Sequence, residues 1–120
     1  MKLIGVRGAT MLKQNDATEM NQAVIELLKE MINKNRIQNE DLVSIIFTTT
    51  DDLNCAFPAA SAREIGLGDV PLLCSKEIDV PNAPRLVIRI LMHTYSNISR
   101  KDVTHVYLRG AEVLRQDLAQ

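Results

Sequence analysis

The chain has 120 residues, 46% of them hydrophobic, and its 14 basic and 15 acidic side chains leave a net charge of −1. This length and apolar content predict a single domain, residues 1–120, that buries its own core. Composition argues against nucleic-acid and membrane partners, because only 3% of residues are aromatic, no basic stripe occurs, and no apolar stretch approaches the length of a bilayer span.

The first half of the chain predicts two strands separated by a long helix. Residues 2–9 (KLIGVRGA) are expected to form a strand whose two glycines leave open space beside the backbone. Apolar residues recur at helical spacing over residues 17–34, and Asp16 is a predicted N-cap, with Glu19 completing a capping box three positions later. Residues 42–50 (LVSIIFTTT) are rich in β-branched side chains and predict a buried strand.

The second half predicts a short helix followed by three strands. Residues 58–66 begin with proline and end with glycine, the residue types that start and stop a helix. Residues 70–74 predict a strand, and residues 76–84, with two prolines, predict a loop. We favour a central strand over a buried helix for residues 85–94, because β-branched residues crowd there. Residues 104–114 alternate apolar and polar side chains, as a half-buried strand does.

Arg89 stands within LVIRIL, residues 86–91, where one guanidinium interrupts five aliphatic residues. Neither face of the predicted strand is expected to be hydrated, so this guanidinium would be buried. A buried guanidinium is costly unless its donors meet an anion. Two sources of that anion remain open: an internal carboxylate, either Glu77 or Asp79, or a ligand that binds next to Arg89.

Three further arginines next to apolar residues favour an anionic ligand. Arg7 also interrupts an apolar strand, Arg63 lies on the short helix, and Arg115 lies in EVLRQDL. Considered singly, Arg63 and Arg115 are more simply interpreted as solvated surface charges. Together the four arginines outnumber the two candidate acids, and arginine captures carboxylates through two parallel hydrogen bonds. The sequence therefore predicts a small cationic pocket for a ligand that carries carboxylates.

The motifs of covalent, metal and cofactor chemistry are missing from the sequence. There is no catalytic triad, glycine-rich phosphate loop or dinucleotide fingerprint. The two histidines have no acidic or thiol companions at ligand spacing, so no metal site is predicted.

Cys55 and Cys74 are too few for a disulfide scaffold, and with an N-terminal segment unlike a signal peptide they indicate a cytoplasmic protein. Cys74 has no basic partner at recognisable spacing, so we interpret it as a packing residue and not a nucleophile.

Six segments in register along the chain resemble the monofunctional trimeric chorismate mutases of the AroH class. They are GVRGAT at residues 5–10, TTDDLNCAFPAASARE at 49–64, VPLLCSKEIDV at 70–80, RI at 89–90, HVYL at 105–108 and VLRQDL at 113–118. The resemblance implies an α+β fold, a small mixed β-sheet with helices on one face. It also implies a homotrimer that forms a pseudo-α/β barrel, with active sites between adjacent subunits and residues 57–63 supplied by the neighbour.

The function that this resemblance implies is the Claisen rearrangement of chorismate to prephenate, on the route to phenylalanine and tyrosine. The reaction is unimolecular and needs no nucleophile, metal or cofactor. Arg89 would stabilise the negative charge that gathers on the ether oxygen as its bond to carbon breaks. Arg7 and Tyr107 would hold the side-chain carboxylate, Glu77 would accept a hydrogen bond from the ring hydroxyl, and Cys74 would lie beside that hydroxyl.

The resemblance assigns binding roles to four more residues. Phe57 and Leu114 would pack on the substrate, while Arg63 and Arg115 would guide or hold the ring carboxylate. Two alternatives remain open at this point: a trimer of related fold that hydrolyses imines, and a carboxylate-binding protein of the same fold that has no turnover.

Overall fold

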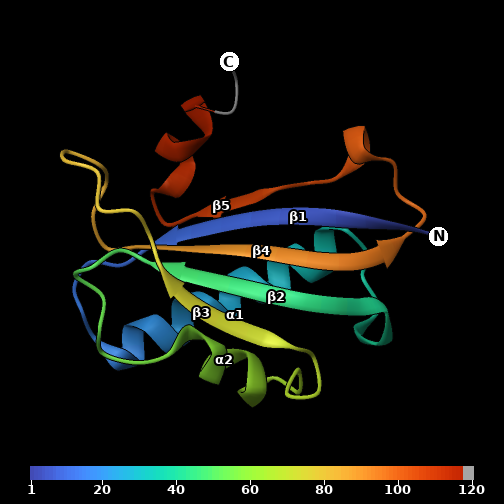
Figure 1. Cartoon of the computed structure of the whole chain (residues 1–120), viewed down its shortest axis with the longest axis horizontal. Coiled ribbons are helices and arrows are strands. Elements are labelled where there is room, and N and C mark those ends of the chain that lie inside the picture. The colour runs from blue at the N-terminus through green and yellow to red at the C-terminus, as the bar shows by residue number, and fades with distance from the viewer. Residues whose placement is uncertain (118–120) are drawn as a thin grey trace.

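In the described part of the chain, residues 1–117, five strands form one mixed sheet in this computed structural model (Figure 1). The strands are β1 (Lys2–Met11), β2 (Leu42–Thr49), β3 (Leu72–Lys76), β4 (Val87–Ser96) and β5 (Val106–Leu108). Their order across the sheet is β3-β2-β4-β1-β5, with β4 antiparallel to both neighbours and the two outer pairs parallel. Side chains are described for residues 1–114.

Two α-helices in this part of the chain, α1 (Ala17–Lys34) and α2 (Pro58–Glu64), cover one face of the sheet (Figure 1). Three short 3₁₀ segments, η1 (Asn39–Asp41), η2 (Arg100–Asp102) and η3 (Ala111–Asp117), complete the described elements. Within residues 1–117, no helix has both the length and the apolar content that a bilayer crossing requires. The predicted α+β fold, a mixed sheet with helices on one face, is confirmed.

The elements predicted before residue 104 are all present, and their ends differ from the predicted ones by at most two residues. The helix predicted over residues 17–34 coincides with α1. The strand predicted over residues 85–94 instead begins at Val87. Leu86 has a φ of 57°, in the left-handed region, and a residue in that conformation does not continue a strand.

The strand predicted over residues 104–114 is wrong beyond Leu108. The observed strand β5 covers three residues and is followed by η3. The reason lies in the backbone, because Arg109 and Gly110 have φ values of 53° and 92°. Two consecutive left-handed residues reverse the chain direction, so the alternation of side chains after Leu108 does not reflect an extended backbone.

Helix α1 begins where its capping residues predict. The carboxylate of Asp16 accepts a hydrogen bond from the N–H of Glu19 at 2.8 Å, as an N-cap does. The Glu19 carboxylate does not complete the predicted box at the cap itself, but accepts the N–H groups of Lys13 and Gln14 at 2.7 and 3.2 Å. Glu19 thus fastens the connection between β1 and α1.

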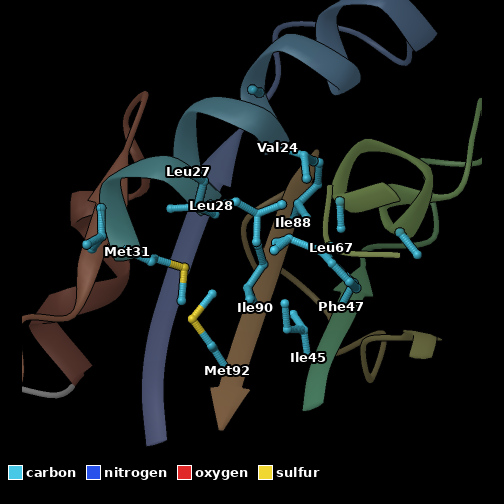
Figure 2. Close-up of a cluster of buried hydrophobic side chains, with 14 of the residues drawn as sticks. Val24, Leu27, Leu28, Met31, Ile45, Phe47, Leu67, Ile88, Ile90 and Met92 are labelled. Carbon is cyan, nitrogen blue, oxygen red and sulfur yellow. The ribbon is translucent and has the colours of Figure 1, made fainter. Parts of the chain in front are cut away.

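The main hydrophobic core lies between α1 and the centre of the sheet. Figure 2 shows Leu27 and Leu28 of α1 packed over Ile88 and Ile90 of β4, with Phe47 of β2 beside them. All five side chains are 2% exposed or less. Since alternate residues of a strand point to opposite faces, this packing assigns the even-numbered residues of β4 to the helix side.

Gly8 allows α1 to approach β1 closely. A Cβ added at Gly8 would lie 2.4 Å from the Met31 sulfur and 3.1 Å from the Leu27 Cδ1. We expected Gly5 and Gly8 to leave open space beside Arg7, and this expectation is wrong for Gly8. Strand alternation puts Gly8 and Arg7 on opposite faces of the sheet, and the space beside Gly8 is filled by α1. At Gly5 an added Cβ would meet only the Leu91 Cδ1, at 3.8 Å.

Neither α1 nor α2 covers the opposite face of the sheet, and we call it the open face. Leu3, Leu73, Leu91 and Tyr95 lie on it with exposed fractions of 55%, 60%, 38% and 49%. The expectation that both faces around Arg89 are dry is wrong for the single chain, in which the Arg89 side chain is 45% exposed. The sequence could not reveal this, because an uncovered face rich in leucine resembles a covered one.

Candidate active site

A row of residues crosses all five strands on the open face, with Arg89 at its centre. Arg89 lies opposite Thr48 of β2 on one side and Ala9 of β1 on the other. Thr48 in turn lies opposite Ser75 of β3, and Ala9 lies opposite Tyr107 of β5. Residues directly opposite one another in a sheet share a face, so this row brings distant parts of the sequence together on the open face.

Glu77 is the internal partner of Arg89. Its Oε2 lies 3.5 Å from the Arg89 Nε and also accepts a hydrogen bond from the Thr48 hydroxyl. The backbone N–H of Glu77 donates to the Thr49 carbonyl at 2.9 Å, which fixes the start of the loop after β3. Of the two carboxylates that the sequence offered, Glu77 forms the ion pair. Because the Glu77 and Arg89 side chains are 28% and 45% exposed, the pair contributes little to stability and instead holds two charges in place.

Arg7 lies on the same open face, diagonal to Arg89. Its direct partner on β4 is Leu91, two residues along from Arg89. Diagonal neighbours of this kind are about 7–8 Å apart at the backbone, within reach of two long side chains. The N–H of Arg7 donates to the His105 Nδ1 at 2.9 Å, just before the β1–β5 ladder begins. Sequence reasoning assigned no role to His105 or Thr48, although His105 precedes the predicted site residue Tyr107 at strand spacing; no predicted site residue lies at that spacing from Thr48.

Tyr107 and Leu114 belong to a small second cluster at one end of the open face. The cluster contains Ala9, Val87, Ala111 and Leu114, with Tyr107 packed against it. Leu114 is 5% exposed and comes from η3, which folds over this end of the sheet. Arg115 follows in the backbone of η3, but its side chain lies outside the described ones. The fold thus brings Tyr107 and Leu114 next to the row that contains Arg89.

Phe57 and Arg63 lie on the helix layer, away from Arg89 of the same chain. Phe57 precedes α2 and is 74% exposed, and Arg63 is exposed in the last turn of α2. The helix buries Ala59 and Ala62 against the main core, which turns Arg63 outward. One chain therefore does not bring these two residues together with the open face.

Cys74 lies on the helix-covered side of the sheet. It is opposite Phe47, which is fully buried, and it packs against the main core. Glu77 and Ser75 are an odd number of residues away from Cys74 and belong to the open face. The role of Cys74 beside the ring hydroxyl of the substrate stays a prediction. Within one chain, the register of β3 against β2 does not support this role, because it puts Cys74 and Glu77 on opposite faces.

A cavity of about 440 Å³ opens beside Glu77. Residues 50–52, which follow β2, line one side, and residues 77–85 line the other. Two ion pairs border it, Lys76 with Asp51 at 3.7 Å and Arg85 with Asp52 at 3.3 Å. In the described residues, no three histidine, cysteine, aspartate or glutamate side chains gather closely enough to hold a metal ion. The end of the open face thus carries paired charges next to a hollow of small-molecule size.

Comparison with known proteins gives one consistent set of relatives. A family model described as chorismate mutase type I matches residues 3–118. The chain is 44% identical over 115 residues to chorismate mutase AroH of Thermus thermophilus, with 95% of this chain and 94% of the relative covered. It is 35% identical over 120 residues to chorismate mutase AroH of Bacillus subtilis (strain 168), with 99% and 94% covered. A solved chorismate mutase from Clostridium thermocellum superposes with a TM-score of 0.90 and 45% identity, covering 92% of this chain and 98% of that one.

Proposed function

The chain belongs to the chorismate mutase type I family, and from this premise we propose that Arg89 provides the charge that accelerates the conversion of chorismate to prephenate. The protein is a chorismate mutase, an isomerase of aromatic amino-acid biosynthesis. The family match also favours this function over the imine-hydrolysing trimer considered from sequence. The observation that carries the catalytic role is the position of Arg89 at the centre of the open-face row, held by Glu77.

The proposed mechanism is electrostatic stabilisation of the transition state. As the ether C–O bond of chorismate breaks ahead of C–C bond formation, negative charge gathers on the ether oxygen. A fixed guanidinium at that oxygen binds the transition state more tightly than the substrate, and this difference lowers the barrier. Glu77 and Thr48 support the required geometry, because Glu77 contacts both the Thr48 hydroxyl and the Arg89 guanidinium.

The other groups on the open face would bind the remaining polar atoms of the substrate. We assign Arg7 and Tyr107 to the side-chain carboxylate, since both lie on the face of Arg89, Arg7 on the adjacent strand β1 and Tyr107 on β5 beyond it. Glu77 would accept a hydrogen bond from the ring hydroxyl, and Leu114 would pack on the substrate from η3. Arginine and tyrosine suit a carboxylate because both donate hydrogen bonds to its oxygens.

We propose that the protein is a homotrimer and that each active site includes residues of an adjacent subunit. The open face exposes Leu3, Leu73, Leu91 and Tyr95, and an apolar patch of this kind marks an interaction surface. Phe57 and Arg63 lie on the helix layer, so they would reach a substrate on Arg89 only from a neighbouring chain. An adjacent subunit would also shield Arg89 from water and strengthen its charge. Sedimentation equilibrium should give three times the 13.4 kDa of one chain.

Four further residues complete the proposal for the site. Arg63 and Arg115, the latter within η3, would guide or hold the ring carboxylate, while Phe57 would pack on the substrate. Cys74 is the weakest member of the proposed set, because its strand register points it toward the core.

We propose that the enzyme works in the cytoplasm, since Cys55 and Cys74 are both free thiols, which a reducing compartment preserves.

The direct test is consumption of chorismate by the purified protein. Chorismate absorbance should fall in proportion to the protein concentration while prephenate accumulates. The carboxylate-binding alternative predicts a different result, in which chorismate binds but its concentration stays constant. Calorimetric binding without turnover would therefore overturn the proposed catalysis.

A further inference from the structure

Leu86 holds an unusual backbone conformation immediately before β4. Its φ of 57° lies in the left-handed region, which a leucine rarely adopts because its Cβ crowds the carbonyl oxygen. Such a conformation persists only where surrounding contacts determine it, and residues of this kind cluster at functional sites. The groups that hold Leu86 are therefore candidates for a role in the site.

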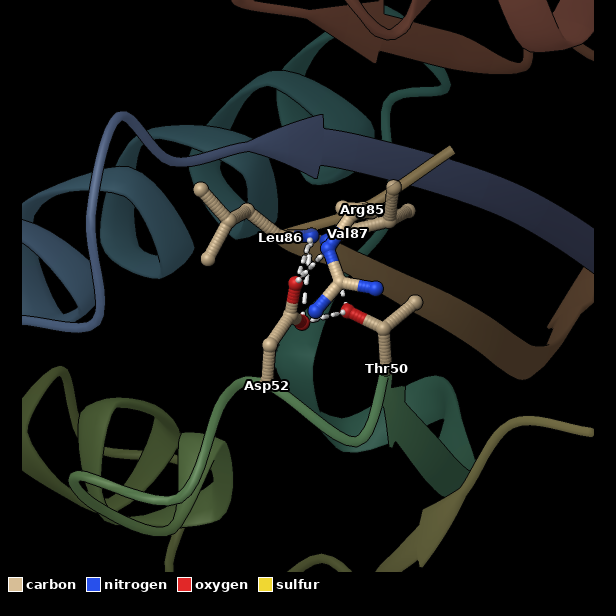
Figure 3. Close-up of polar contacts among 5 residues, drawn as sticks. All are labelled: Thr50, Asp52, Arg85, Leu86 and Val87. Atoms are coloured by element: carbon tan, nitrogen blue, oxygen red, sulfur yellow. Dashed lines mark hydrogen bonds and ion pairs between the residues drawn. The ribbon is translucent and has the colours of Figure 1, made fainter. Parts of the chain in front are cut away.

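The Asp52 carboxylate is the main group that holds Leu86, as Figure 3 shows. Its two oxygens lie 3.2 and 3.1 Å from the N–H of Leu86, which donates to both. The hydroxyl of Thr50 donates to Asp52 Oδ1 at 2.6 Å and accepts the N–H of Val87 at 3.0 Å. On the other side, the Leu86 carbonyl accepts the N–H of Leu12 at 2.9 Å. Both ends of the left-handed residue are thus fixed.

The hydrogen bonds to Leu86 matter more than the ion pair that Asp52 also makes. Asp52 is only 16% exposed at its side chain, whereas its partner Arg85 is 77% exposed. A pair with so exposed a cation is screened by water and contributes little. A mostly buried carboxylate that accepts backbone N–H groups makes stronger, charge-assisted bonds.

Leu86 ends the loop of residues 77–85, and Glu77 begins it. This loop faces residues 50–52 across the cavity of about 440 Å³. If Leu86 relaxed to an extended conformation, the chain before it would leave in a different direction. The wall of the cavity therefore depends on the conformation of Leu86, and Glu77 stands at the other end of the same loop.

We propose that Asp52 is a positioning residue, which holds Leu86 left-handed, fixes the loop of residues 77–85 and so keeps the Glu77 carboxylate against Arg89. This inference rests on the proposed catalytic role of Glu77 and Arg89. Asp52 acts through the backbone of the loop and not on the substrate. It deepens the proposed function by naming the group that makes the Glu77–Arg89 geometry rigid.

The test is a double-mutant cycle on kcat with Asp52→Ala and Glu77→Ala. Asp52→Ala should lower kcat by about tenfold or more, because displacement of a catalytic group by about 1 Å can cost up to about 100-fold. In the Glu77→Ala background the same change should lower kcat by less than about twofold, since the group that Asp52 positions is gone. An equal loss in both backgrounds would overturn the role of Asp52 while leaving the proposed function intact. Normal turnover of Glu77→Ala would instead contradict the proposed site.

Asp16→Ala is the matched control for loss of stability. Asp16 also accepts a backbone N–H with its carboxylate, at 2.8 Å, but it caps α1 and has no part in the site. Both variants should lower Tm, whereas only Asp52→Ala should lower kcat. If Asp16→Ala at the same Tm loses as much kcat, the effect of Asp52 is one of general stability and the proposal fails.

A rescue experiment keeps the proposal testable if Asp52→Ala folds poorly. Glycine adopts positive φ without strain, so Leu86→Gly in the Asp52→Ala background should restore folding and part of kcat. Leu86→Gly alone provides the reference for the lost leucine side chain. Asp52→Asn keeps the size of the side chain and should show an intermediate kcat. A folded double variant with no gain in kcat over Asp52→Ala, or an Asp52→Asn variant with unchanged kcat, would contradict the link through Leu86.

Discussion

The two faces of the central sheet differ in what covers them and in what their side chains do. On the helix side, Ile88, Ile90 and Met92 of β4 are at most 2% exposed and pack on α1. On the open side, the alternate residues Arg89 and Leu91 remain 45% exposed at the side chain and 38% exposed, respectively. One strand therefore contributes to the stability of the fold through one set of residues and to the proposed chemistry through the other. Substitutions on the two faces should separate folding from catalysis.

The largest effect on stability is expected from Leu28→Ala on the helix side. Leu28 is fully buried in the core, and removing such a side chain leaves a cavity that costs about 2–5 kcal/mol. Thermal or urea unfolding measures the loss. The matched change on the open face is Leu3→Ala, which should lower Tm by less than Leu28→Ala, because Leu3 is 55% exposed in one chain and only the proposed adjacent subunit would cover it. If the two substitutions lower Tm equally, the proposed difference between the faces is incorrect.

Arg89→Ala should have the largest effect on catalysis. Removal of one preorganised donor commonly lowers kcat by about 10²-fold or more, and we expect at least that loss here. Arg89→Lys should also be poor, because an ammonium on a flexible stem does not reproduce the planar guanidinium. Chorismate consumption gives kcat, and Tm should change little. Arg100→Ala, an exposed arginine in η2, is the control. Near-normal turnover of either Arg89 variant would refute the assigned role.

Gly8→Ala tests the close approach of α1 to β1. The added methyl group would meet the Met31 side chain at 2.4 Å, and overpacking of this kind costs about 1–3 kcal/mol. The cost should fall at the low end of that range, because methionine adapts its shape readily. Differential scanning calorimetry measures the change, and kcat per folded molecule should be preserved. An unchanged Tm would show that Met31 moves aside freely.

Arg63→Ala should produce the smallest of these effects, seen mainly in kcat/KM. An arginine that guides the substrate contributes to binding in both the ground state and the transition state, so KM should rise while kcat changes less. Steady-state kinetics at several salt concentrations would measure it, since salt screens an exposed charge. A large selective fall in kcat would place Arg63 in the same class as Arg89 and reverse our ranking of the arginines.

Local patterns in the sequence were enough to predict most elements and to limit the partners of Arg89 to a few candidates. The helical spacing over residues 17–34 and the cap at Asp16 depend on contacts within a few residues, so they could be identified without a fold. A guanidinium next to apolar groups requires an anion, and Glu77 was one of the candidates left open for Arg89, with Asp79 and an anionic ligand as the others. The resemblance to chorismate mutases added the roles of the site residues, which local patterns alone do not assign.

The tertiary structure decided the features that depend on residues far apart in the sequence. The sequence does not reveal that one face of β4 is uncovered, that Cys74 points to the core, or that the chain reverses at Arg109 and Gly110. It also gives no sign that Asp52 holds Leu86 in a left-handed conformation. Periodicity specifies which residues share a face, but the identity of the group that covers that face is set by strand order and register. Strand order and register depend on many contacts between residues far apart in the sequence, and no short segment of the chain contains both partners of such a contact.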